Sequence, residues 1–217
     1  MINVTLFSSV AFIYLFSSLL YFCYLFFRKE KVGKAATALM VVGLIVQTIA
    51  YGVRWVESYQ SGVGHSPFSF FTTYETLVFT CWSVAIVYFV IEYKYQMRIL
   101  GAIIMPLISL GMLYASLSPN VAGEIEALPS VLKGNVFIYH VVSCFLGIAA
   151  FGISCLVSVF TLIMGNPGRA IPLLKKFSDR LPPSEILEDL SYKTLAVGFV
   201  LFSIGIIILI KTFVRRN

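Results

Sequence analysis

The sequence predicts an all-α membrane protein, a polytopic bundle of about six transmembrane helices. The chain has 217 residues, of which 59% are hydrophobic and only 12% are charged. Average soluble domains contain roughly 45–50% apolar and about 25% charged residues. A soluble fold of this size needs a charged surface that this composition does not supply. The apolar residues also fall into runs of about 20, the length with which a helix spans a bilayer.

Six apolar runs define the expected helices, and we expect them to form a single membrane domain over residues 1–217. No basic residues precede the first run, which is longer than a signal-peptide core, so we interpret it as a retained helix. The fourth run contains Pro106, which removes a backbone donor and should kink the helix. The fifth is long enough to tilt. The runs are 4–27, 36–53, 74–91, 99–117, 136–164 and 195–210.

The basic residues predict the orientation of the chain. The first, third and fifth loops contain four, two and five Lys or Arg residues, whereas the second and fourth contain one each. The positive-inside rule therefore places the odd loops in the cytoplasm and the N-terminus and even loops outside. Lys211, Arg215 and Arg216 follow the sixth run and contradict this pattern. Either that run does not cross the membrane, or this tail is not what normally follows it.

Charge and cysteine patterns argue against several classes of function. The net charge of +6 comes from short clusters between apolar runs, so we expect no nucleic-acid partner. The four cysteines lie inside apolar runs without a Cys-x-x-Cys pair, which argues against a disulfide framework or a zinc site. Carboxylates are nearly missing from the runs, which disfavours an ion-coupled transporter. Glu75 is expected at the start of the third helix, either in a capping box with Thr72 or in a functional role.

The two histidines, His65 and His140, are the candidate ligands. His65 lies in the second loop. His140 follows Asn135, a candidate N-cap of the fifth helix, by five positions. At 1.5 Å per residue it should lie roughly 7–8 Å from the start of the helix, near the outer headgroup boundary.

The residues on the same helix face as His140 are small. Helical spacing places Ser143, Cys144 and Gly147 there. An imidazole above small residues leaves room for a flat, bulky group, and haem is the obvious candidate because imidazole is its commonest axial ligand. Close packing against another helix also requires small residues. Spacing alone leaves both interpretations open.

Short stretches along most of the chain resemble the amino-terminal portion of the CcsA/ResC family of cytochrome c biogenesis proteins. Each stretch alone is a modest match to the family, but the order of the stretches along the chain and the sides of the membrane on which they are expected make the match specific. They are Arg-Trp-Val-Glu-Ser-Tyr at 54–59, His-Ser-Pro at 65–67, Tyr-Glu-Thr-Leu-Val-Phe at 74–79 with Trp82, Tyr-Ala-Ser at 114–116, His-Val at 140–141, Asp-Leu-Ser-Tyr-Lys at 189–193, Gly-Phe at 198–199 and Ile-Gly-Ile at 204–206.

The resemblance implies a component of the system II machinery, which handles haem at the outer membrane face for attachment to apocytochrome c. It implies a ResB/CcsB-type membrane partner and a haem b that binds non-covalently, as a substrate does. His140 matches the family's outward axial ligand. A partner chain, a second copy or His65 would then supply the second ligand. We expect the bacterial cytoplasmic (inner) membrane, in preference to the thylakoid membrane.

One departure from the family pattern is large. The family's tryptophan-rich signature loop should follow the sixth run, but the printed sequence ends there, after Lys211 and six further residues. We therefore expect a truncated, split or diverged member, served by a companion chain that carries the loop. We expect the chain to be at most one part of a haem-attachment (holocytochrome c synthase) complex. The alternatives are a non-enzymatic membrane subunit or anchor without haem of its own, and a small permease.

Overall fold

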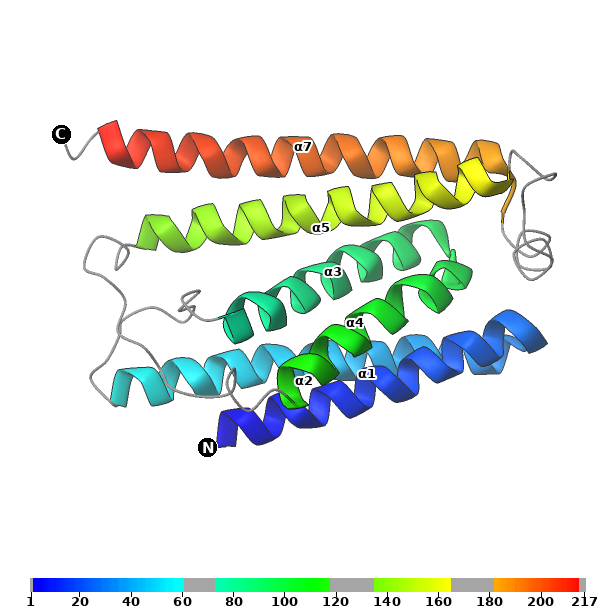
Figure 1. The fold of residues 1–217 in the computed structure, drawn as a ribbon, viewed down its shortest axis with the longest axis horizontal. Coiled ribbons are helices and arrows are strands. Elements are labelled where there is room, and N and C mark those ends of the chain that lie inside the picture. Colours follow the sequence, from blue (N-terminus) through cyan, green and yellow to red (C-terminus); the bar gives the residue numbers. More distant parts are fainter. Residues whose placement is uncertain (1, 61–72, 118–134, 165–181, 215–217) are drawn as a thin grey trace.

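The computed structural model describes residues 2–60, 73–117, 135–164 and 182–214, and this part of the chain is helical apart from short turns (Figure 1). Six helices are long and apolar enough to cross a membrane, which confirms the predicted all-α fold with six spans. The elements are α1 (Ile2–Phe27), α2 (Glu30–Gln60), α3 (Thr73–Tyr95), the 3₁₀ helix η1 (Arg98–Leu100), α4 (Gly101–Leu117), α5 (Asn135–Met164) and α7 (Ser184–Val214).

Two helices are considerably longer than the apolar runs that predicted them. α2 begins six residues before its run and ends seven residues after it, and α7 begins eleven residues early. α7 starts directly after Pro183, whose carbonyl accepts from the amide of Ile186 at 3.1 Å. Glu185 lies in its first turn, where a carboxylate is favoured by the helix dipole. Hydropathy marks the part of a helix that lies in lipid, whereas these helices continue into the polar boundary.

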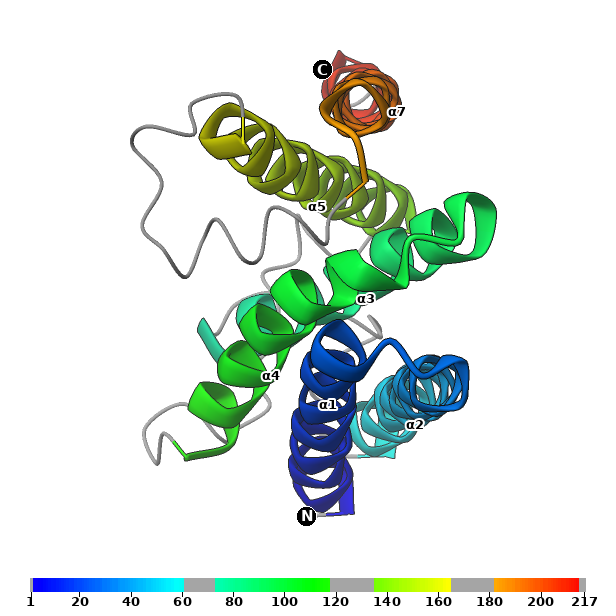
Figure 2. The same cartoon turned by 90° about the vertical axis from the view of Figure 1, so that its right-hand side faces the viewer.

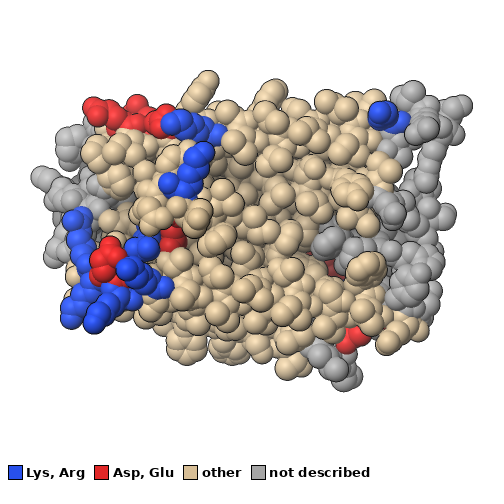
Figure 3. Space-filling model, turned by 180° about the vertical axis from the view of Figure 1, so that it is seen from behind, with Lys and Arg blue, Asp and Glu red and all other residues tan. Residues whose placement is uncertain are grey.

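The six helices alternate in direction, so the bundle has two distinct ends (Figure 1). The start of α1 and the end of α7 lie at one end, here called the terminal end, together with the starts of α3 and α5. The opposite end is here called the basic end, because most Lys and Arg residues visible on the face in Figure 3 gather there. It contains the turn between α1 and α2, the element η1 and the start of α7.

The helices form two pairs joined by α3 and α4. α5 packs chiefly on α7, and α1 packs on α2 and α4. α3 contacts α2, α4 and α5, so it connects the two parts of the bundle. The end-on view in Figure 2 shows α5 and α7 on one side of α3 and α4, with α1 and α2 on the other. α4 continues as a helix through Pro106, and its kink stays a prediction.

Two tight turns close the basic end. Arg28 and Gln96 follow α1 and α3 with φ of 51° and 54°, in the left-handed region that ends many helices. Their amides donate to the carbonyls of Tyr24 and Glu92 at 2.9 and 2.8 Å, four residues back. Each turn therefore satisfies a carbonyl at the end of a helix and sends the chain directly into the next one.

Buried polar side chains connect the helices within the bundle. Tyr14 of α1 donates to Gln47 Oε1 of α2 at 2.8 Å, and Gln47 Nε2 donates to the carbonyl of Val78 in α3 at 3.1 Å. Both polar side chains are fully buried. Because lipid offers no hydrogen-bond partner, polar groups inside a membrane bundle must find partners within the protein. These contacts fix α1, α2 and α3 relative to one another.

Candidate functional site

His140 lies near the start of α5, at the terminal end, and its ring faces α7. Its Nδ1 atom is 2.7 Å from the carbonyl oxygen of Gly205. A carbonyl can only accept, so Nδ1 carries the proton in this contact. In the neutral ring the other nitrogen, Nε2, then has a free lone pair. The ring is half-buried, and it lies 6.2 Å from the ring of Phe137 one turn earlier.

This arrangement suits an imidazole that binds a metal. Histidines that ligate metals almost always donate their second ring N–H to a carbonyl, a carboxylate or water, which fixes the tautomer and the orientation of the ring. The Gly205 carbonyl does the same for His140. Among the residues that the structure describes, no group of three or more His, Cys, Asp or Glu is placed to hold a metal ion. The hydrogen bond to Gly205 thus orients His140 as a single metal-ligating imidazole would be oriented.

Glycine at position 205 allows α7 to approach His140 this closely. A Cβ atom at this position would lie 2.6 Å from Cys144 Sγ and 3.2 Å from the His140 carbonyl oxygen. Both distances are shorter than ordinary van der Waals contact. Cys144 Sγ also lies 3.6 Å from His140 Nδ1, so His140, Cys144 and Gly205 form one compact contact.

The same close packing recurs at two further levels along α5 and α7, spaced by seven residues. A Cβ on Gly147 would lie 3.0 Å from the carbonyl oxygen of Gly198. Seven residues further, Ser154 Oγ donates to the Ser191 carbonyl at 2.8 Å. The register thus pairs residue 140 with 205, 147 with 198, and 154 with 191. A seven-residue repeat of small residues holds two helices in continuous close contact.

The structure places the predicted site residues as follows. Cys144 and Gly147 lie in the contact with α7, and Ser143 is half-buried. We expected space for a flat group beneath His140. Beside Cys144 and Gly147, α7 occupies this space, as the helix-packing interpretation predicts. The haem-facing role of the three residues stays a prediction. His65 lies outside the described residues, and so does the Asn135 side chain expected to cap α5.

Sequence reasoning missed a buried ion pair at the terminal end. Arg54 of α2 donates through Nε to Glu75 Oε1 of α3 at 3.1 Å, and through Nη2 to the same oxygen. Their exposed fractions are 5% and 6%. The guanidinium also lies 6.0 Å from the ring centre of Tyr74. Arg54 was expected in a loop, but α2 continues past it. Thr72, the expected capping partner of Glu75, lies outside the described residues.

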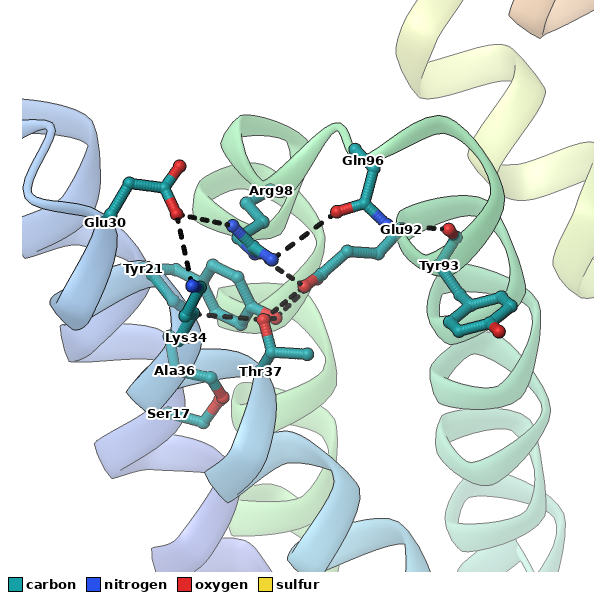
Figure 4. Close-up of polar contacts among 11 residues, drawn as sticks. Ser17, Tyr21, Glu30, Lys34, Ala36, Thr37, Glu92, Tyr93, Gln96 and Arg98 are labelled. Atoms are coloured by element: carbon teal, nitrogen blue, oxygen red, sulfur yellow. Dashed lines mark hydrogen bonds and ion pairs between the residues drawn. The ribbon is translucent and has the colours of Figure 1, made fainter.

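A second buried carboxylate, Glu92, lies at the basic end (Figure 4). It is 3% exposed and accepts from the hydroxyls of Tyr21, at 2.5 Å, and Thr37. Arg98 Nε lies 3.6 Å from Glu92 Oε1, and Arg98 also reaches Glu30 at 3.4 Å. The cluster joins α1, α2, α3 and η1. Glu92 immediately follows an apolar run, and this was the only sequence signal that could have pointed to it.

Comparison with known proteins identifies the family. The sequence model of a family described as cytochrome C assembly protein matches residues 70–208. The chain belongs to the cytochrome c assembly family. The match includes α3, α4 and α5 and most of α7, and therefore His140 and Gly205. The predicted resemblance is confirmed.

Curated relatives in the cytochrome c assembly family are proteins named cytochrome c biogenesis protein CcsA. That of Guillardia theta is 30% identical, over 92% of this chain and 70% of the relative. That of Prochlorococcus marinus is 27% identical, over 75% and 57%. That of a Synechocystis species is 25% identical, over 83% and 67%. The chain thus spans between 57% and 70% of the length of these relatives. No solved structure matches it.

We predict that Gly205→Ala destabilises the contact between α5 and α7. The added Cβ overpacks the site, which costs about 1–3 kcal/mol. Cys144→Ala should restore much of this loss, because it removes the Sγ atom that the new Cβ would meet at 2.6 Å. Thermal unfolding of the purified variants in detergent measures the effect. Gly152→Ala in α5 is the matched control, since a Cβ there meets nothing within 4 Å. Equal stability of the Gly205 and Gly152 variants would contradict the prediction.

We predict that Glu75→Gln lowers stability strongly, because it leaves the buried Arg54 cation without its anion. Breaking a buried ion pair from one side typically costs about 3–5 kcal/mol. The control is Lys34→Gln, which breaks an exposed pair with Glu30 and should change stability by about 1 kcal/mol or less. Thermal unfolding compares the two variants, and similar melting temperatures would show that the Arg54 pair is not held in a buried environment.

Proposed function

We propose that this chain handles haem at the outer membrane face, as a component of system II cytochrome c biogenesis, for attachment to apocytochrome c. Membership of the cytochrome c assembly family and the CcsA name of the curated relatives support this function. The single structural observation that carries it is the 2.7 Å contact between His140 Nδ1 and the Gly205 carbonyl. That contact leaves Nε2 free to bind a metal, on a helix that begins at the terminal end of the bundle.

The proposed substrate is haem b, bound non-covalently with its iron on His140 Nε2. Imidazole is a common axial ligand of haem iron. The Gly205 carbonyl holds the ring in the tautomer that ligation requires. Ser143, Cys144 and Gly147 lie beside the haem in this proposed site, and α7 covers Cys144 and Gly147 on one side.

A six-coordinate haem needs a second axial ligand. We propose that a companion chain with the tryptophan-rich loop, a second copy of this chain, or His65 supplies it. A ResB/CcsB-type membrane protein and apocytochrome c are the proposed partners. The chain spans only part of its relatives, so we assign haem attachment to the assembly of these proteins. Family membership does not favour the alternative of a membrane anchor without haem.

The proposed location is the bacterial cytoplasmic (inner) membrane, in preference to the thylakoid membrane, with the N-terminus outside. The protein itself is a multi-pass membrane protein, and its curated relatives include cyanobacterial proteins. The accumulation of Lys and Arg at the basic end supports the cytoplasmic placement of that end (Figure 3). His140 then lies near the outer lipid boundary.

We predict that His140→Ala removes the haem absorption band of membranes that express the chain with a ResB-type partner. The substitution removes the nitrogen that binds iron, and added free imidazole should restore part of the band. Absorption spectra of membranes or purified complex measure both effects. His65→Ala in the same background shows whether the second histidine also contributes to the haem band. A band of unchanged intensity in His140→Ala would contradict the assignment of His140 as an axial ligand of haem.

We predict that alkaline phosphatase fused after Gln60 is active and that a fusion after Phe27 is inactive. The enzyme folds only outside the cytoplasm, and α2 separates the two positions. Equal expression of both fusions is the control. The reverse pattern of activity would place His140 on the cytoplasmic side and would contradict haem delivery to the outer face.

A further inference from the structure

A groove of about 480 Å³ runs along the bundle between α3, α5 and α7. α5 forms its floor with Leu146 and Ala150, and α3 and α7 form its walls. α3 and α7 both pack on α5, and the groove lies where they flank it. Val90 of α3 and Val197 of α7 line it and are 54% and 56% exposed, so the groove is open to the surrounding lipid.

The groove is apolar along its length and polar at one end. At the basic end it is lined by Lys94 and Tyr95 of α3 and by Tyr192 and Lys193 of α7. Toward the middle of the bundle it ends near Ile86 and Leu201, eight residues from the respective lysines. Eight residues of helix correspond to about 12 Å.

This length matches one leaflet of a bilayer. The hydrocarbon core is about 30 Å thick, so one leaflet contributes about 15 Å. A transmembrane helix of a partner would need a groove of twice that length. A single lipid acyl chain fits, with its headgroup at the polar end. Tyrosine residues are common at this depth, where their hydroxyl groups reach the headgroup region.

The two charged side chains that line the polar end, Lys94 and Lys193, favour an anionic headgroup. Lys94 Nζ lies 5.6 Å from the ring centre of Tyr95, and among the described residues no carboxylate forms an ion pair with it. Lys193 pairs with Asp189 at 2.6 Å, but its side chain is 53% exposed. An ammonium group has three donors, so Lys193 can bind Asp189 and a phosphate oxygen together. Basic pockets between helices at a cytoplasmic boundary typically bind anionic lipids.

We infer that the groove between α3, α5 and α7 is a binding site for one anionic phospholipid of the leaflet at the basic end. One acyl chain lies on Leu146 and Ala150, and the phosphate accepts from Lys94 and Lys193. This site is separate from the proposed haem site, because its lysines lie at the basic end of the bundle and His140 lies at the terminal end. The inference does not depend on the role of His140.

Native mass spectrometry of the delipidated chain tests this inference with phosphatidylglycerol and phosphatidylcholine of identical acyl chains. We expect one phosphatidylglycerol to bind in preference to phosphatidylcholine. Lys94→Gln should weaken its binding about fivefold, the equivalent of about 1 kcal/mol for one lysine at a charged membrane surface. Lys193→Gln should also weaken it. Lys34→Gln is the control, because this exposed lysine lies at the basic end but outside the groove.

Ala196→Trp tests the location of the lipid. Ala196 is exposed and lines the groove, so an indole there should fill it and displace the lipid. Leu195→Trp, at the neighbouring position outside the groove, should leave binding unchanged. Equal binding of the two lipids, or unchanged binding in both Lys94→Gln and Ala196→Trp, would overturn the inference. Displacement of the lipid by a partner helix or by haem at equimolar concentration would also overturn it.

Discussion

The antiparallel contact of α5 with α7 is the interaction on which the candidate site depends. It brings the helices together at three levels seven residues apart, where Gly147 meets Gly198, Ser154 meets Ser191, and His140 meets Gly205. Small residues are needed because lipid provides no hydrophobic drive for helices to associate, so packing and hydrogen bonds must hold them together. At the contact nearest the terminal end, α5 has His140 in place of a small residue.

Lipid imposes the same requirement on the other helices. With no water to pair with, each polar group must find a partner inside the protein. Glu92 therefore receives two hydroxyl donors and a guanidinium, and Glu75 receives Arg54. The Glu92 cluster joins α3 to the distant helices α1 and α2, and the Glu75 pair joins the consecutive helices α2 and α3. Each lies near one boundary of the bundle. The carboxylates act as fixed connections between helices, which explains why an otherwise apolar protein keeps them.

The sequence predicted the six helices and the family, because hydropathy and motif order can be read along the chain without knowing which residues meet in space. Residue 140 was singled out for its type and its distance from the helix start. Its partner could not be found in this way, because the Gly205 carbonyl is a backbone group 65 residues away. Arg54 was misplaced for a related reason. Its charge marks the end of an apolar run, whereas the helix continues because Glu75 offers a partner from α3. Tertiary pairing decides such positions.

The ligand properties of His140 are coupled to helix packing. The ring keeps its proton on Nδ1 only while Gly205 remains opposite, and Gly205 remains there only while the seven-residue register of α5 and α7 is intact. A shift of one helix along the other would release Nδ1 and allow the ring to rotate or exchange its proton. In the proposed haem site, a movement of α7 would therefore change the affinity of Nε2 for iron, because the hydrogen-bond partner of the second ring nitrogen tunes a metal-ligating histidine. Under the proposed function, which requires haem to be held and then released, such a movement of α7 would link helix packing to release.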